Sequence, residues 1–197
     1  MPQLRLVESR GGPKRPKLVE DGVLGMILFI FVELMVFAGL ISAFVIVKEA
    51  ALPGMWPPPD QPRLPWQETL VNTSALVASG GILLKAQQAL RSGEHGVARK
   101  RVGIAMALGA FFVAFQGFEW VGLIGQGLTM LSSQLGGFFY LIVGCHALHA
   151  LVALSALAWV HRRMRSPDFK PHVLTTAALF WYFVVAVWPV LYWQVYL

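Results

Sequence analysis

Long apolar runs interrupted by short charged segments constrain the fold of this chain more than any other sequence feature. The runs lie near residues 23–47, 69–89, 102–124, 136–159 and 173–196. Each is long enough to cross the hydrocarbon layer of a bilayer, about 30 Å thick, as an α-helix that rises about 1.5 Å per residue. The composition, 56% hydrophobic and only 13% charged, is typical of an integral membrane protein. We therefore predict an all-α integral membrane bundle of five transmembrane helices.

The distribution of lysine and arginine predicts the orientation of these helices. Basic residues concentrate before the first run, between the second and third, and between the fourth and fifth, whereas only Lys48 and Arg63 fall on the other side. Because positively charged loops stay in the cytoplasm, we expect the N-terminus inside and the C-terminus outside. The first run is too long for a secretory signal peptide, so we interpret it as a retained span. The predicted organisation is a cytoplasmic segment at 1–21 and a five-helix transmembrane domain at 22–197.

The net charge of +6 does not point to a nucleic-acid partner. No basic groove with interleaved stacking aromatic residues is recognisable in the sequence, and the membrane topology explains the basic loops. The single cysteine, Cys145, excludes an intrachain disulfide and a multi-cysteine zinc or iron–sulfur site. After these exclusions, the sequence indicates a membrane protein with few reactive side chains.

Two acidic residues fall within the apolar runs. Glu33 lies near the expected midplane of the first span, and Glu119 lies toward the outer end of the third, one helical turn after Gln116. An ionised carboxylate in hydrocarbon costs about 3 kcal/mol even on the mildest insertion scale, so such groups face protein and are paired or protonated. We expect Glu33 to be protonated and hydrogen-bonded between helices, with a proton relay as the alternative.

Two histidines, His146 and His149, lie three residues apart in the fourth run. They share a helical face with Ala150 and further alanines, so this face is expected to pack against another helix. His146 is expected at a depth comparable to that of Glu119, so a contact between Glu119 and a histidine is geometrically possible. A metal site is the alternative, although ligands on adjoining turns of one rigid helix rarely converge on one ion. Its ligands would be Cys145, His146, His149 and Glu119.

A stripe of small residues follows helical spacing in the third run. It consists of Gly103, Ala107, Ala110 and Ala114. Small residues let helix backbones approach closely in a membrane, so this stripe predicts a helix-packing face.

Six motifs stand in collinear order from Gly25 to the C-terminus. They are "GMILFIFVELMVFAGL", "WPPP", "LVNTSALVASG", "FQGFEW", "FFYLIVGCHALHALVAL" and "FWYFVVAVWPVLYWQVYL". Together they resemble subunit III of the cytochrome c oxidases in the haem–copper superfamily. The five-span length is similar to that of bacterial members that lack the first two helices of the seven-span version.

The resemblance implies an accessory subunit that carries no haem, copper or other metal. Such a subunit braces the catalytic subunit I, sustains proton entry into it and binds phospholipid. Haem and copper are then expected on that partner, other respiratory subunits are further partners, and the bacterial inner (plasma) membrane is the expected location. The residues that match family positions are expected to form buried hydrogen bonds, with a lipid-related or proton-related role for Glu33. They are Glu33, Gln116, Glu119, His146 and His149.

The last run departs from the family pattern at two positions. Where the family usually reads Trp-His-Phe-Val-Asp, this chain reads "WYFVV", so Tyr182 and Val185 replace the histidine and the aspartate. We expect the interaction that this polar pair makes elsewhere to be missing or replaced here.

The function that the sequence favours is that of a cofactor-free subunit III in a proton-pumping terminal oxidase. A homologous subunit of a quinol oxidase, or of a nitric-oxide-reductase-associated protein, is the alternative within the superfamily. Two alternatives of other classes are a small proton-coupled transporter built around Glu33 and a membrane metalloprotein that uses Cys145, His146 and His149.

Overall fold

The computed structural model describes residues 20–52, 55–58 and 61–196. Within these ranges the chain forms five long α-helices and no strand, so the predicted all-α class is confirmed. All five helices are long and apolar enough to cross a membrane. Most of the predicted N-terminal segment, 1–21, lies outside the described residues. The helices are α1 (Asp21–Glu49), α2 (Trp66–Arg91), α3 (His95–Gly125), α4 (Gln134–Arg163) and α5 (Pro171–Leu191), and the π-helical turn η1 (Tyr192–Tyr196) continues the last.

Each helix begins before its apolar run, most clearly α3. This helix begins at His95, well before the run that starts at residue 102, and its first turns carry Arg99, Lys100 and Arg101. Lysine and arginine are good helix formers, and their long side chains reach the headgroup layer from a helix end. The charged residues therefore lie outside the apolar run but inside the helix.

The helix ends follow local sequence signals. The Ser133 hydroxyl accepts a hydrogen bond from the Gly136 amide and caps the start of α4, and Pro171 occupies the first turn of α5. Gly93 and Gly127, just after α2 and α3, have φ angles of 79° and 93°. The amide of the residue after each glycine donates to the carbonyl oxygen five residues earlier, from Glu94 to Ala89 and from Leu128 to Leu123. This is the pattern of a Schellman motif.

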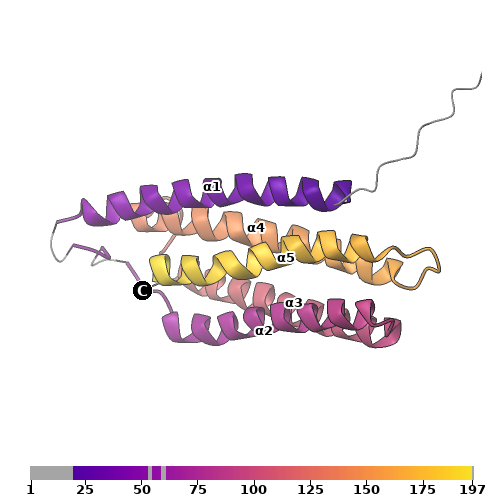
Figure 1. Ribbon diagram of the computed structural model, residues 1–197. Coiled ribbons are helices and arrows are strands. Elements are labelled where there is room, and N and C mark those ends of the chain that lie inside the picture. The colour runs from indigo at the N-terminus through magenta and orange to yellow at the C-terminus, as the bar shows by residue number, and fades with distance from the viewer. Residues whose placement is uncertain (1–19, 53–54, 59–60, 197) are drawn as a thin grey trace, which may run out of the picture.

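The fifth helix has a central position in the bundle. It contacts α1, α2 and α4, while α2 pairs closely with α3, and α4 contacts α1 and α3. Figure 1 shows α1 along one side of the bundle and α2 along the other, with α4 and α5 between them. Trp181 and Trp188 of α5 are completely buried. By contrast, the buried residues of α1 are only Phe37 and Phe44 within its described length.

Two glycines allow close packing around α5. A Cβ atom on Gly109 of α3 would lie 2.5 Å from Cη2 of Trp181, and one on Gly80 of α2 would lie 3.1 Å from Cγ1 of Val185. Carbon atoms pack at about 3.5–4.0 Å. The indole of Trp181 therefore occupies the space that a larger residue at position 109 would need.

The predicted small-residue stripe on α3 is only partly covered within this chain, since Gly103 lies against His161 of α4 but the three alanines do not pack. Ala107, Ala110 and Ala114 are exposed, and the buried face of α3 includes Ala105 and Gly109 instead. The sequence predicted a helix-packing face without naming its partner, and these three alanines find none within the described chain. Periodic small residues show that a face permits close approach, but the neighbours of a helix decide which face is buried.

Gly109→Ala tests the contact with Trp181. We expect this variant to lower the stability of the bundle by about 1–3 kcal/mol, because the added methyl group overpacks the core. Gly122→Ala is the matched control, since a Cβ at this position of the same helix meets no atom within 4 Å. Heating the detergent-solubilised protein and measuring the remaining folded fraction by size-exclusion chromatography compares the two. Equal losses in both variants would contradict the close packing at Gly109.

Candidate functional site

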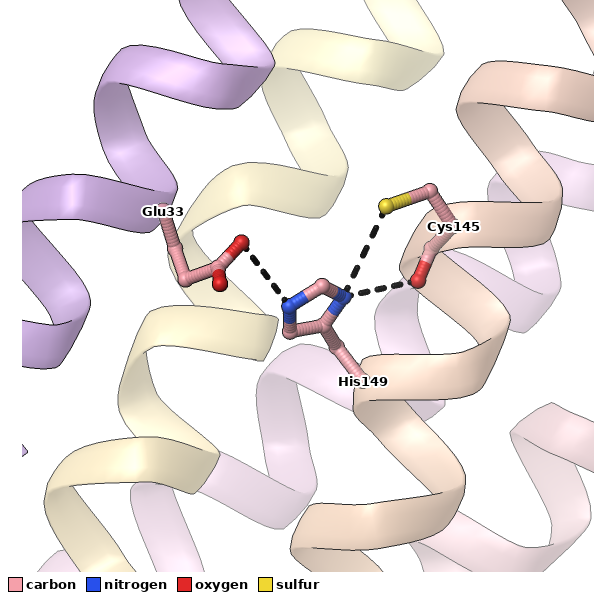
Figure 2. A network of polar contacts seen from close by, with 3 residues as sticks. All are labelled: Glu33, Cys145 and His149. Atoms are coloured by element: carbon pink, nitrogen blue, oxygen red, sulfur yellow. Dashed lines mark hydrogen bonds and ion pairs between the residues drawn. The ribbon is translucent and has the colours of Figure 1, made fainter.

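A polar contact between α1 and α4 brings together two of the predicted site residues. The Nε2 atom of His149 lies 3.1 Å from Oε2 of Glu33, and their side chains are only 12% and 18% exposed. Figure 2 shows the two side chains pointing toward each other across the gap between the helices. Aromatic rings of Phe37, Phe180 and Phe183 surround the imidazole at centroid distances of 5.5–6.1 Å. An apolar shell thus encloses a single polar pair.

The other ring nitrogen of His149 defines how the pair shares a proton. Nδ1 lies 2.8 Å from the backbone carbonyl oxygen of Cys145, which accepts hydrogen bonds and cannot donate them. Nδ1 therefore carries a hydrogen, assigned from this bonding geometry. One further proton then lies between Nε2 and the Glu33 carboxyl. Wherever that proton sits, the pair as a whole is neutral, which suits its place in a membrane span.

His146 faces a different part of the bundle from His149. Its ring packs on the Trp188 indole of α5 at a centroid distance of 4.9 Å and lies 6.4 Å from the ring of Phe112 of α3. The side chain is 1% exposed, and neither ring nitrogen has a hydrogen-bond partner among the described residues. The two histidines therefore do not point to a common centre.

The metal-site alternative is not supported by this geometry. The Cys145 sulfur is 3.8 Å from Nδ1 of His149, but that nitrogen already bonds to the Cys145 carbonyl oxygen. In the described part of the chain, no group of three or more histidine, cysteine, aspartate or glutamate side chains could hold a metal ion. The two histidines point to different neighbours, and Glu119 bonds to Thr69 in a separate contact.

Glu119 belongs to a second polar cluster, formed by α2, α3 and η1. The Thr69 hydroxyl lies 3.0 and 3.1 Å from the two carboxyl oxygens of Glu119. The Gln116 amide donates to Glu119 Oε2 at 2.8 Å and to the Tyr196 hydroxyl at 3.0 Å. All four residues are buried. Gln116 and Glu119 thus connect the C-terminal turn to the first turns of α2.

The contact that the sequence allowed between Glu119 and a histidine does not form among the described residues. Glu119 faces Thr69 of α2, whereas His149 faces Glu33 of α1. Similar depth in the membrane places two residues at one level, but the rotation of each helix about its axis decides whether they meet. The predicted residues therefore fall into two separate polar clusters, with His146 between α3 and α5.

Sequence reasoning missed a row of polar residues on α2 that joins it to its neighbours. Trp188 Nε1 donates to the Thr73 hydroxyl at 2.8 Å, and Trp181 Nε1 donates to the Ser79 hydroxyl at 3.0 Å. Ser79 in turn donates to the Ala105 carbonyl, and the Asn72 amide donates to the Phe112 carbonyl. The signal was present in the sequence. Thr69, Asn72, Thr73 and Ser79 recur at helical intervals on one face of an otherwise apolar run.

Tyr182 and Val185, which differ from the family pattern, both contact α2. The Tyr182 hydroxyl donates to Oε1 of Gln87 at 2.7 Å, and Val185 lies against the bare backbone of Gly80. The first contact is a hydrogen bond and the second is apolar packing. Tyr182 and Val185 therefore connect α5 to α2 without a histidine or an aspartate.

Comparison of the sequence with known proteins identifies the family. The family model of cytochrome c oxidase subunit III matches residues 8–197. The chain belongs to the cytochrome c oxidase subunit III family. It is 33% identical over 185 residues to a probable cytochrome c oxidase subunit 3 of Nocardia farcinica, covering 92% of this chain and 89% of that protein. It is also 33% identical over 194 residues to cytochrome c oxidase subunit 3 of Synechocystis, covering 96% and 80%.

The chain covers a smaller share of an animal relative. The chain is 32% identical over 188 residues to cytochrome c oxidase subunit 3 of Ornithorhynchus anatinus, covering 91% of this chain but 71% of that protein. The Nocardia relative is covered to 89%. The chain therefore covers more of this bacterial relative than of the animal one.

Substitution of Glu33 tests the neutral pair. Glu33→Gln retains an amide that donates to His149 Nε2, so we expect nearly normal amounts of folded chain in the membrane. Glu33→Lys places a cation beside His149 within an apolar shell, and we expect most of the folded chain to be lost. Met35→Lys, at an exposed position of the same helix, measures the general cost of a lysine at this depth. Equal yields of folded protein for the two Glu33 variants would contradict the shared-proton pair.

A double-mutant cycle measures the hydrogen bond between Tyr182 and Gln87. We expect Tyr182→Phe and Gln87→Met to be coupled by about 0.6–1.7 kcal/mol, the usual range for hydrogen bonds between transmembrane helices. Unfolding of the purified protein in mixed detergent micelles gives the free energies. Gln88→Met replaces an exposed neighbouring glutamine and should show no coupling with Tyr182→Phe. A coupling near zero at Gln87 would show that the bond adds nothing to stability.

Proposed function

We propose that this chain is the accessory, cofactor-free subunit III of a proton-pumping haem–copper terminal oxidase, a cytochrome c oxidase of an aerobic respiratory chain. It braces the catalytic subunit I and supports proton uptake by that subunit. The observation that carries the proposal is the match to the subunit III family model over residues 8–197. Haem and copper then reside on the catalytic subunit, and other respiratory subunits are further partners.

The use of polar side chains in the bundle supports a structural role. The described carboxyl and imidazole groups within the apolar runs contact other helices or lie in the core. His149 uses both ring nitrogens for contacts within the chain. Hydrogen bonds of this kind hold helices in position, which is the property a brace requires.

The outer faces of α1 and α3 supply surfaces for membrane partners. Within its described length α1 buries only Phe37 and Phe44, although the helix is strongly apolar. The exposed alanines of α3, Ala107, Ala110 and Ala114, leave room for another helix to approach closely. These faces support the proposal that the chain packs against further subunits in the membrane.

The connections between helices support the proposed orientation. Figure 1 shows the α2–α3 and α4–α5 connections at one end of the bundle and the α1–α2 connection at the other. The first end carries basic residues such as Arg91, Arg101, Arg163 and Lys170. With the positive end inside, the C-terminus lies outside. Bacterial relatives such as that of Nocardia farcinica favour the bacterial plasma membrane as the location.

A groove between α1 and α5 supports phospholipid binding. It has a volume of about 480 Å³, and its walls are apolar side chains that include Ile30, Leu34, Ile41 and Val190. The groove is suited to an acyl chain. Phe37 and Phe183 line it and also surround His149, so the groove adjoins the Glu33–His149 pair. A lipid-related or proton-related role of Glu33 would act at this junction.

Isolation of the native complex tests the proposed function. We expect a tagged chain, purified from its own membranes in mild detergent, to bring down haem-bearing subunits in fixed ratio with an oxidase spectrum. The complex should consume oxygen with reduced cytochrome c, and a complex stripped of this chain should keep its haems but take up protons more slowly. Oxidation of quinol instead of cytochrome c would favour the homologous quinol oxidase. A chain that purifies alone and transports protons in liposomes would refute the proposal.

A further inference from the structure

A pocket of about 480 Å³ lies at the end of the bundle where α1 ends and α2 begins. Residues from the last turn of α1, the α1–α2 connection, the first turn of α2, the start of α4 and the turn η1 line it. Polar and apolar atoms contribute comparable accessible surface to its wall, whereas the groove between α1 and α5 is apolar. The pocket is therefore suited to a ligand that has both a polar and an apolar part.

Two basic side chains in the pocket wall have no partner of opposite charge. Lys48 and Arg63 are the only lysine and arginine that the sequence places at this end of the bundle, and both line the pocket. Neither side chain forms an ion pair or a hydrogen bond within the described ranges. Glu68 is the acidic residue of the described wall, so the formal charge of the wall is +1. A ligand with one negative charge would balance it.

The pocket lies at the depth of the lipid headgroups. Lys48 is in the last turn of α1 and Trp66 is the first residue of α2, and both helices are long and apolar enough to cross a membrane. Trp56 and Trp66 line the pocket, and tryptophan is enriched at the membrane–water interface. Leu135 and Val195 add apolar surface to the wall. The glycerol backbone and first acyl carbons of a lipid gain from burial against such side chains, whereas a soluble anion does not.

The pocket and the groove between α1 and α5 follow one another along the same two helices. Phe37 and Ile41 line the groove, and Lys48 lines the pocket on the same face of α1. Ile41 and Lys48 are seven residues apart, or about 10 Å along the helix axis. On the other side, Val190 lines the groove and Val195 lines the pocket. One phospholipid can therefore place its headgroup in the pocket and an acyl chain in the groove.

We propose that this headgroup pocket binds a phospholipid with a single net negative charge, whose phosphate pairs with Lys48 and Arg63 and whose acyl chain lies in the groove between α1 and α5. The inference rests on the phospholipid binding in the proposed function and adds the headgroup class and the direction of the lipid. A glycerol headgroup offers hydroxyl donors to the Glu68 carboxylate. A zwitterionic lipid would leave the positive charge of the wall without a counter-charge.

Photocrosslinking of the intact complex in mild detergent tests the proposal. The probe is phosphatidylglycerol with a diazirine close to its headgroup, and peptide mass spectrometry locates the crosslinks. We expect crosslinks within residues 56–68. Each of Lys48→Gln and Arg63→Gln should lower their yield about fivefold, because each removes one basic group from the lipid phosphate. Unchanged yields in both variants would overturn the proposal.

Two further variants separate charge from folding. Lys48→Arg keeps the positive charge and should retain at least half of the yield at residues 56–68. Lys85→Gln removes an exposed lysine outside the pocket wall, toward the other end of α2, and should leave that yield unchanged. An equal loss in Lys48→Gln and Lys85→Gln would overturn the pairing of Lys48 with the phosphate.

Competition against the photoprobe distinguishes the sources of an anionic group. We expect unlabelled phosphatidylglycerol to suppress the crosslinks at residues 56–68 at concentrations where phosphatidylethanolamine with the same acyl chains does not. Equal suppression by the two lipids would contradict the charge match. Complete suppression by inorganic phosphate would show that the pocket binds a free anion and would overturn the lipid assignment.

A density map of the native complex gives an independent result. Headgroup density between Lys48 and Arg63, continuous with tubular density in the groove, would support the proposal. An acidic side chain of a neighbouring subunit in the pocket, or an empty pocket beside a lipid-filled groove, would overturn it and leave the proposed function intact. A chain that purifies without haem-bearing subunits would refute the proposed function, and photocrosslinking of that full chain would still decide the headgroup pocket.

Discussion

A bilayer interior offers no hydrogen-bond partners, and this constraint accounts for where the polar side chains of the described bundle lie. The indole N–H groups of Trp181 and Trp188 on α5 turn toward hydroxyl groups of α2. The carboxyl groups behave in the same way, since Glu33 meets His149 of α4 and Glu119 meets Thr69 of α2. These four polar groups are therefore also points of attachment between helices.

The packing of α5 depends on complementary choices at neighbouring positions. Gly109 leaves room for the indole of Trp181, and Gly80 does the same for Val185. At the position where the family usually has histidine, Tyr182 reaches Gln87 instead. A transmembrane interface gains little from apolar burial alone, because lipid tails are as apolar as leucine, so shape and hydrogen bonding determine how these helices fit. In this chain Tyr182 and Val185 both connect α5 to α2.

Much of the fold was predictable because a spanning helix must satisfy its own backbone and must be long enough for the membrane. Hydropathy therefore located the helices, but it did not predict the charged first turns of α3. The candidate site was less predictable. The sequence indicated that Glu33, Glu119 and the two histidines would be buried, but it did not give the partner of each. The polar row on α2 was present in the sequence as a periodic pattern, and the small-residue stripe on α3 indicated a packing face but not the helix that covers it.

By itself the sequence determined the helical class, the order of the spans, the positions of the basic loops and the family to which the chain belongs. Those properties depend on the composition of whole segments and on motifs that are contiguous in the sequence. The tertiary structure decided which face of each helix is turned inward and therefore which polar groups meet. His146 and His149 are three residues apart, about 60° around a helix, and this angle suffices to direct one ring into the core and the other toward α1. Such contacts depend on the rotation and neighbours of every helix at once, and no single segment contains that information.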